Sequence, residues 1–166
     1  TGQTVAGVEP KGICGSGYVD AIASLVRRGL LRETGAFTGE NAQGFAFTAG
    51  GEELAITRRD VDLLQRAKGA VGAGIQILLQ TAGVAAGELE RIVIGGAFGR
   101  FLDVANAQCI GLLPPVAPHR VVLCGDTALG GCERLLLSGN GSEVIGRLRN
   151  SARLINLAVR DDFETA

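Results

Sequence analysis

Residues 91–103, RIVIGGAFGRFLD, join a short apolar run to two adjacent glycines, Gly95 and Gly96. The apolar run is typical of a short buried strand over residues 91–94. Glycine has no Cβ, so the backbone after this strand can come close to a flat ligand. From this stretch alone, a ligand contact and a tight packing contact both remain open.

A second glycine-rich loop, GICGSG at residues 12–17, precedes a segment with one apolar face, which predicts a helix that ends before Gly29. Ser16 is the predicted N-cap and Gly29 the predicted C′ glycine. Backbone N–H groups at such a helix start can bind an anion. The loop matches neither GxGxxG nor GxxxxGK, so an anion site and a tight-packing turn remain alternatives.

A long helix is predicted from Arg58 to Ala82, opened by the capping-box pattern Thr57-x-x-Asp60 and ended by Gly83. The predicted apolar stripe of this helix comprises Val61, Leu64, Lys68, Val71, Ile75, Leu78 and Ala82.

Lys68 is the charged member of this stripe. Either its ammonium group snorkels to solvent from the edge of the stripe, or Gln65 and Lys68 face a cleft and reach a ligand. Gly69, Gly72 and Gly74 follow on the same helix, where each glycine costs about 1 kcal/mol relative to alanine. They predict close contact with another backbone.

The remaining polar candidates have structural explanations. Asp20, Asp103 and Asp126 lie at loop–helix junctions beside glycines, where a capping role is favoured over metal binding. The single histidine, His119, is predicted on a surface loop. The four cysteines have no CxxC spacing, which predicts buried, reduced thiols and no metal site in this chain.

Composition excludes several classes of partner. A net charge of −1 with both signs interspersed offers no field for nucleic acid or an anionic membrane. No apolar run is long enough to span a membrane and no signal region opens the chain, so a cytoplasmic location is expected. The sequence contains no methionine, which predicts an excised piece of a longer protein.

The elements read along the chain predict an α/β layer structure with a mixed sheet. A hairpin is expected from residues 44–48 and 53–57, and a second buried strand from residues 119–124. Further helices are expected after Asp103, from Ala128 to Gly139, and from Ser142 to Arg149.

Four blocks together resemble one family: residues 12–29, residues 56–79, residues 92–114 and residues 125–138. The family is the reductive activators of corrinoid enzymes, ferredoxin-containing ATPases that reactivate corrinoid proteins. The resemblance covers nearly all of the chain in the right order. It implies the fold of the acetate and sugar kinase, heat-shock chaperone and actin superfamily, in which ribonuclease-H-like subdomains enclose ATP.

The resemblance also implies roles for particular residues. A strand ending in two glycines forms the adenosine motif of that superfamily, which Gly95, Gly96 and Ala97 match. Gln65 and Lys68 would lie over the nucleoside. Gly125 and Asp126 open a segment similar to the second connecting helix, where small residues let two lobes pack and hinge.

The departures from the family define what residues 1–166 would be. Neither acidic, glycine-rich phosphate turn is present, so the expectation is the C-terminal part of an actin-like ATPase domain, with unknown catalytic residues elsewhere. ATP and Mg²⁺, and a [2Fe–2S] cluster in an N-terminal domain, would belong to the parent protein. The expected partners are adenine nucleotide and a corrinoid protein returned from cob(II) to cob(I), with a homodimer possible.

Two other functions remain as alternatives. One is a sugar or acyl-phosphate kinase of the same superfamily, and the other is a non-catalytic interaction module. If Gly96 exists for close approach of a nucleotide, Gly96→Val is expected to lower nucleotide affinity with little loss of stability.

Overall fold

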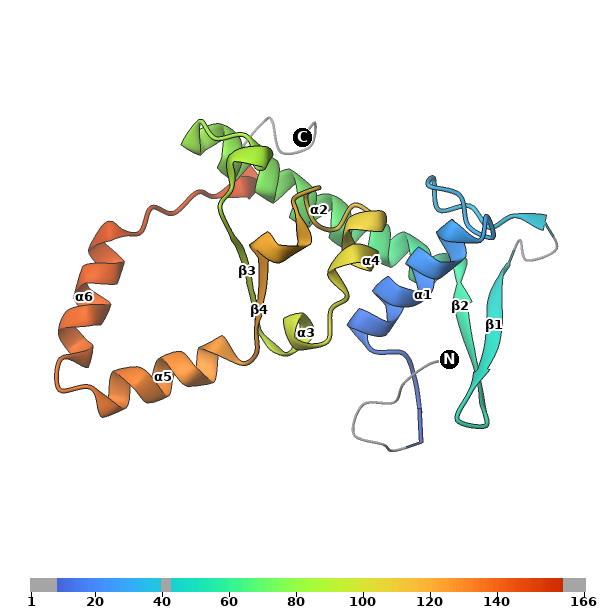
Figure 1. Cartoon of the computed structure of the whole chain (residues 1–166), viewed down its shortest axis with the longest axis horizontal. Helices are drawn as coiled ribbons and strands as arrows, with labels where there is room; N and C mark the ends of the chain where they lie inside the picture. Colours follow the sequence, from blue (N-terminus) through green and yellow to red (C-terminus); the bar gives the residue numbers. More distant parts are fainter. Residues whose placement is uncertain (1–8, 40–42, 160–166) are drawn as a thin grey trace. The chain divides into compact units, whose positions relative to one another are not determined.

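The computed structural model describes residues 9–39 and 43–159 (Figure 1). The chain divides into two compact units, Thr1–Gly72 with Asp103–Pro115, and Ala73–Leu102 with Val116–Ala166. We describe each unit by itself. A short β-like segment expected at residues 1–9 lies outside the described residues except for Glu9.

The first helix of the first unit is α1, Gly15–Arg27, and it ends as predicted before Gly29, whose φ is +68°. Its N-cap is Cys14, so the prediction of Ser16 as N-cap is wrong. Ser16 is instead 7% exposed inside the first helical turn, because the backbone becomes helical already at Gly15.

The predicted hairpin is confirmed as β1, Gly44–Ala49, paired antiparallel with β2, Glu52–Thr57. Gly50 and Gly51 form the turn with φ values of +59° and +87°. Positive φ at both central positions is the conformation that matches the twist of a two-residue hairpin, and glycine adopts it without a Cβ penalty.

The predicted long helix is also confirmed, as α2, Arg58–Ala82. At its start, the backbone N–H of Thr57 donates to the Asp60 carboxylate at 2.9 Å, and the N–H of Asp60 reaches the Thr57 hydroxyl at 3.3 Å. These reciprocal bonds satisfy two N–H groups that a helix start leaves without partners. Gly83, with φ +66°, ends the helix.

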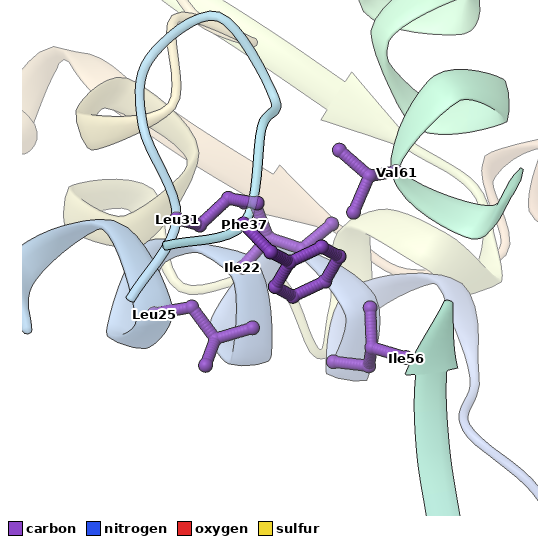
Figure 2. Close-up of a cluster of buried hydrophobic side chains, with 6 residues drawn as sticks. All are labelled: Ile22, Leu25, Leu31, Phe37, Ile56 and Val61. Atoms are coloured by element: carbon purple, nitrogen blue, oxygen red, sulfur yellow. The ribbon is translucent and has the colours of Figure 1, made fainter. Parts of the chain in front are cut away.

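One apolar cluster organises the first unit (Figure 2). Its members come from α1, the following loop, β2 and the start of α2, and are Ile22, Leu25, Leu31, Phe37, Ile56 and Val61. Ile56 is 1% exposed and Val61 is 2% exposed. Burying a side chain of this size contributes about 1.5–3 kcal/mol, so the cluster is what joins the hairpin to the helices.

The same unit contains α4, Val104–Cys109, which contacts α1. Asp103 is its N-cap, as predicted, and its carboxylate accepts from the Asn106 N–H at 2.7 Å. The helix ends at Cys109, before the proline pair at positions 114 and 115, because Gly111 takes a φ of +71°.

In the second unit, β3, Ile92–Gly95, pairs parallel with β4, Val121–Cys124. The predicted mixed sheet is therefore wrong for the described residues: the antiparallel and parallel pairs form two separate sheets, each with two strands. Val93 on β3 is 59% exposed, and Val122 and Leu123 on β4 are 37% and 36% exposed, so the prediction that both strands are buried is also wrong.

Helices follow each of these strands. After β3 comes the short α3, Ala97–Arg100, and after β4 come α5, Thr127–Leu137, and α6, Gly141–Ser151. The N-cap of α6 is Asn140 rather than the predicted Ser142. Short 3₁₀ turns are formed by Ala86–Glu88, Pro118–Arg120 and Leu157–Val159.

The buried face of α2 changes along the helix. Val61 is buried as predicted, but the predicted stripe members Val71 and Leu78 are 46% and 54% exposed, while Ala73 and Ile77 are buried. The change falls where α2 passes from one unit to the other, so the two halves pack against different surroundings. Among the described residues, no helix is both long and apolar enough to cross a membrane.

We expect Thr57→Ala to lower the free energy of unfolding by about 1 kcal/mol at neutral pH, because it removes the hydroxyl of the capping box. The two Thr57 bonds hold the pKa of Asp60 below its usual value. A carboxylate with a lowered folded-state pKa contributes stability above its unfolded pKa and loses it as the pH falls through the folded pKa. Urea unfolding should therefore show the difference between wild type and Thr57→Ala shrinking below about pH 4.

Asp62→Asn is the matched control, because Asp62 makes only an exposed i,i+4 ion pair with Arg66. A difference between wild type and Thr57→Ala that stayed constant from neutral to acid pH would contradict the capping role of the Asp60 carboxylate.

Candidate functional site

The ends of β3 and β4 bring two glycine turns together. The strands are parallel, and Gly95 lies opposite Cys124 in the register. The N–H of Gly96 donates to the carbonyl of Gly125 at 2.8 Å, which continues the pairing into the turns. Residues 95–97 and 125–126, predicted from two separate motifs, therefore lie at one edge of this sheet. The carboxyl ends of parallel strands are where α/β proteins commonly bind ligands.

Gly95 is required by packing within this edge. A Cβ at Gly95 would collide with the Thr127 hydroxyl and would also lie 3.1 Å from the Thr127 methyl group. The absence of a side chain at Gly95 therefore lets the two turns approach each other. Thr127 was not identified from the sequence, because its partner is distant along the chain.

Gly96 differs from Gly95. Its φ and ψ are +95° and 167°, a region that is essentially restricted to glycine, and it is the N-cap of α3. A Cβ built there meets no atom of the described residues within 4 Å. Space is therefore open at Gly96, as ligand approach requires. The expectation that Gly96→Val causes little loss of stability is wrong, because a residue with a side chain is strained at this φ.

Asp126 is the N-cap of α5, and its carboxylate accepts from the Leu129 N–H at 3.1 Å. This matches the capping role favoured from the sequence. Within residues 9–39 and 43–159, no group of three His, Cys, Asp or Glu side chains could hold a metal ion.

Aromatic and cationic side chains follow the glycine pair. Phe98 and Phe101 are 45% and 51% exposed, and the Arg100 guanidinium lies 5.5 Å from the centre of the Phe101 ring. Exposed rings beside bare backbone can stack on a planar group. The sequence analysis did not assign these residues, although the pattern FGRF directly after a glycine pair could have signalled them.

Gln65 and Lys68 belong to the first unit, whereas the glycine turns belong to the second. Gln65 and Lys68 line a pocket of about 290 Å³ in the first unit, formed by α1, α2, the residues after α1 and the end of α4. The Lys68 ammonium group donates to the Ile110 carbonyl, the C-cap of α4, at 3.0 Å. Lys68 is therefore bonded to a helix end, which neither of its two predicted roles included.

Gln65 is held beside a second bare backbone. Gly35 has a φ of +81°, and a Cβ there would lie 2.5 Å from the Gln65 amide nitrogen.

The close backbone contact predicted for Gly69, Gly72 and Gly74 is wrong for the described residues. A Cβ at Gly69 or Gly72 meets nothing within 4 Å, and one at Gly74 meets the Leu157 side chain at an ordinary 3.4 Å.

The glycine-rich loop before α1 carries a thiol, that of Cys14, at the N-cap position of the helix. The Ser16 hydroxyl, followed by the Gly17 N–H, holds the pKa of the Cys14 thiol below its usual value. A Cβ at Gly17 would lie 3.1 Å from the Ile13 side chain, which supports the tight-turn alternative for this loop. All four cysteines are free, but Cys14, Cys109 and Cys132 are exposed, so the prediction of burial is wrong.

A side-chain network ties α1 to α4. Asn106 accepts from the Arg27 guanidinium at 2.7 Å and donates to the Asp20 carboxylate at 2.7 Å. Asp20 therefore has a structural role in place of the predicted helix cap.

His119 is exposed in a 3₁₀ turn, as predicted.

Comparison with known proteins gives consistent matches. The family model described as the C-terminal domain of RACo, the ASKHA domain, matches residues 1–166. The corrinoid activation enzyme RamQ of Eubacterium limosum is 36% identical over 185 residues, covering 98% of this chain and 31% of RamQ.

Two further relatives agree with these matches. A reductase of Methanosarcina barkeri named for a Co(II) methylated amine-specific corrinoid protein is 30% identical over 131 residues, covering 79% of this chain and 23% of the reductase. The solved structure of a reductive activator for corrinoid, iron–sulfur protein superposes with a TM-score of 0.87 at 29% identity, covering 98% of this chain and 28% of that one. The chain thus spans less than a third of each relative.

We expect Gly95→Ala to destabilise the protein by about 1–3 kcal/mol, the usual result of overpacking a close contact. Thr127→Ala removes the two nearest atoms of that contact. The double variant should therefore recover most of the loss in a double-mutant cycle followed by urea unfolding. Gly87→Ala is the control, because a Cβ there meets nothing within 4 Å of the described residues. Additive effects of the two substitutions would contradict the packing role of Gly95.

Lys68→Met should lower the free energy of unfolding by about 1–2 kcal/mol, because it removes a charged donor from the C-terminal end of α4. The apolar stem of the side chain is retained, so the change reports the ammonium group. Lys11→Met, at an exposed position, serves as the comparison in the same thermal unfolding experiment. Equal stability of the two variants would show that the bond to Ile110 contributes nothing.

Proposed function

The chain belongs to the family of the C-terminal ASKHA domain of RACo, and from this premise we propose that residues 1–166 are the adenine-nucleotide-binding part of an ATP-dependent reductive activator of corrinoid proteins. The proposal draws on the names of the relatives, which are a corrinoid activation enzyme, a corrinoid protein reductase and a reductive activator. Because the chain spans less than a third of each, the complete activity is proposed for the parent protein.

The observation that carries the proposal is the pair of glycine turns at the ends of β3 and β4. Gly96 leaves space beside bare backbone, and the hydrogen bond from Gly96 to Gly125 holds the second turn beside it. We assign Gly95, Gly96 and Ala97 to the nucleoside, with Gly125 and Asp126 in the neighbouring turn. Gln65 and Lys68 remain proposed binding residues of the first unit, supported by the pocket that they line within that unit.

The residues present fit a nucleoside better than a metal–phosphate group. The Asp126 carboxylate already caps α5, and the described residues hold no cluster of metal ligands. The proposal therefore places Mg²⁺ and phosphate binding in the remainder of the parent protein. The four free cysteines likewise do not form a cluster site, so the [2Fe–2S] group is proposed for another domain.

In this proposal ATP supplies the free energy that drives one electron from a reduced iron–sulfur cluster onto Co(II) of the corrinoid protein, giving Co(I). The contribution of this chain is to bind and orient the nucleoside through backbone and small side chains. The free thiols accord with a reducing, cytoplasmic setting.

The proposal is tested by calorimetric titration of the full-length protein with ATP and ADP. Gly96→Ala should weaken binding at least about tenfold, because the added Cβ enters the open space and strains the turn. Gly83→Ala is the matched control: Gly83 also has positive φ and open surroundings, but it ends α2 away from the strand ends. Equal affinities of wild type and Gly96→Ala would overturn the assignment.

A second measurement separates the activator from a small-molecule kinase. Addition of a corrinoid protein in the Co(II) state should change the rate of ATP hydrolysis by the full-length protein. An unchanged rate in the presence of bound nucleotide would refute the activator function while retaining nucleotide binding.

A further inference from the structure

Exposed apolar side chains are distributed unevenly over the chain. Apart from Leu63 and Val71, the large apolar residues that are exposed in the described part of the chain all lie in the second unit. The apolar cluster of Figure 2 lies entirely in the first unit. The second unit therefore leaves apolar surface uncovered where the first unit buries it.

The helical hairpin of α5 and α6 holds much of this surface. The two helices contact each other, yet α5 has no buried residue and α6 buries only Gly141. Leu129, Cys132 and Leu136 occur at i, i+3 and i+7, which places them on one face of α5. Leu129 is 58% exposed, Leu136 84% and the adjacent Leu137 88%.

The second helix of the hairpin repeats the pattern. Ile145 and Leu148 are spaced i, i+3 on α6 and are 50% and 60% exposed. Covering a single leucine contributes about 1.5–3 kcal/mol, and contiguous exposed apolar surface in soluble proteins marks an interaction site. We call the set Leu129, Cys132, Leu136, Leu137, Ile145 and Leu148 the hairpin face.

We propose that the hairpin face is the surface on which the remainder of the parent polypeptide packs. The matched relatives identify this occupant by their length, because residues 1–166 correspond to 31%, 23% and 28% of the three proteins. More than two thirds of each relative is therefore available to cover the face. The inference rests on family membership and on these lengths, and it is independent of nucleotide binding at the glycine turns.

The charges beside the hairpin face favour an apolar occupant. Glu133 and Arg134 on α5, and Glu143 and Arg147 on α6, alternate in sign. Such alternation creates no single-sign field that would attract nucleic acid or an anionic membrane. The hydrophobic effect is then the main source of affinity. An apolar surface in the same chain has the further advantage of a high effective concentration.

Cys132 provides a native reporter, because it lies on the hairpin face between Leu129 and Leu136 and is exposed in this structure. We expect a maleimide to label Cys132 in the native full-length protein at least about tenfold more slowly than in the same protein unfolded by urea. Peptide mass spectrometry resolves this thiol from the other cysteines of the full-length protein. Equal labelling rates in the native and unfolded protein would overturn the proposal.

A photoreactive benzoylphenylalanine at position 136 identifies the occupant. A crosslink within one polypeptide to a residue outside residues 1–166 supports the proposal. A crosslink between isotopically distinct copies would replace it with a homodimer interface, and a crosslink only within residues 1–166, or no crosslink at all, would refute it. These results do not depend on nucleotide, so they are separable from the titration at Gly96.

Leu136→Glu gives a second, independent readout. In the full-length protein it should increase the labelling rate of Cys132 at least about fivefold by weakening the cover over the hairpin face. Leu154→Glu, at a position that is 92% exposed and outside the hairpin, is the control and should leave the rate unchanged. The same rate in both variants would count against an apolar cover at Leu136.

Discussion

The arrangement of the candidate site depends on one backbone hydrogen bond, from the N–H of Gly96 to the carbonyl of Gly125. It extends the parallel pairing of β3 and β4 beyond the strands and holds two turns, far apart in the sequence, against each other. The turns can come this close because Gly95 has no side chain to collide with Thr127. The two adjacent glycines therefore differ in what they allow: Gly95 lets the turns meet, and Gly96 leaves open backbone beside them.

The two units differ in how they are stabilised. The first contains a buried apolar cluster to which helices, a loop and a hairpin all contribute, together with hydrogen bonds from Asn106 and Lys68 that fix α4. The second has a two-stranded parallel sheet with exposed faces and a helical pair with little burial. Parallel strands are usually covered on both faces, so the exposed sheet is a second feature consistent with the proposed packing of the rest of the parent polypeptide on this unit.

Local signals in the sequence predicted local structure well. The Thr57–Asp60 capping box, the Gly50–Gly51 turn and the Asp103 cap depend on neighbouring residues, and all three are present. Long-range contacts were not predictable in this way. Lys68 bonds to Ile110, Thr127 explains Gly95, and the buried face of α2 shifts to Ile77, because partners distant in sequence decide each of these features. The family resemblance drew attention to the two glycine turns, and the position of Asp126 before a helix predicted the cap that the structure shows.

The Asn106 network has a consequence for how this part of the chain can vary. A carboxamide both donates and accepts, and Asn106 uses the two capacities at once, toward Asp20 and Arg27. An aspartate at position 106 would still accept from Arg27, but it would place a second carboxylate against Asp20. A neutral hydrogen-bond donor at position 20 would then have to accompany it. Positions 20, 27 and 106 are therefore expected to change together in related proteins, as a coupled set whose members lie on two different helices.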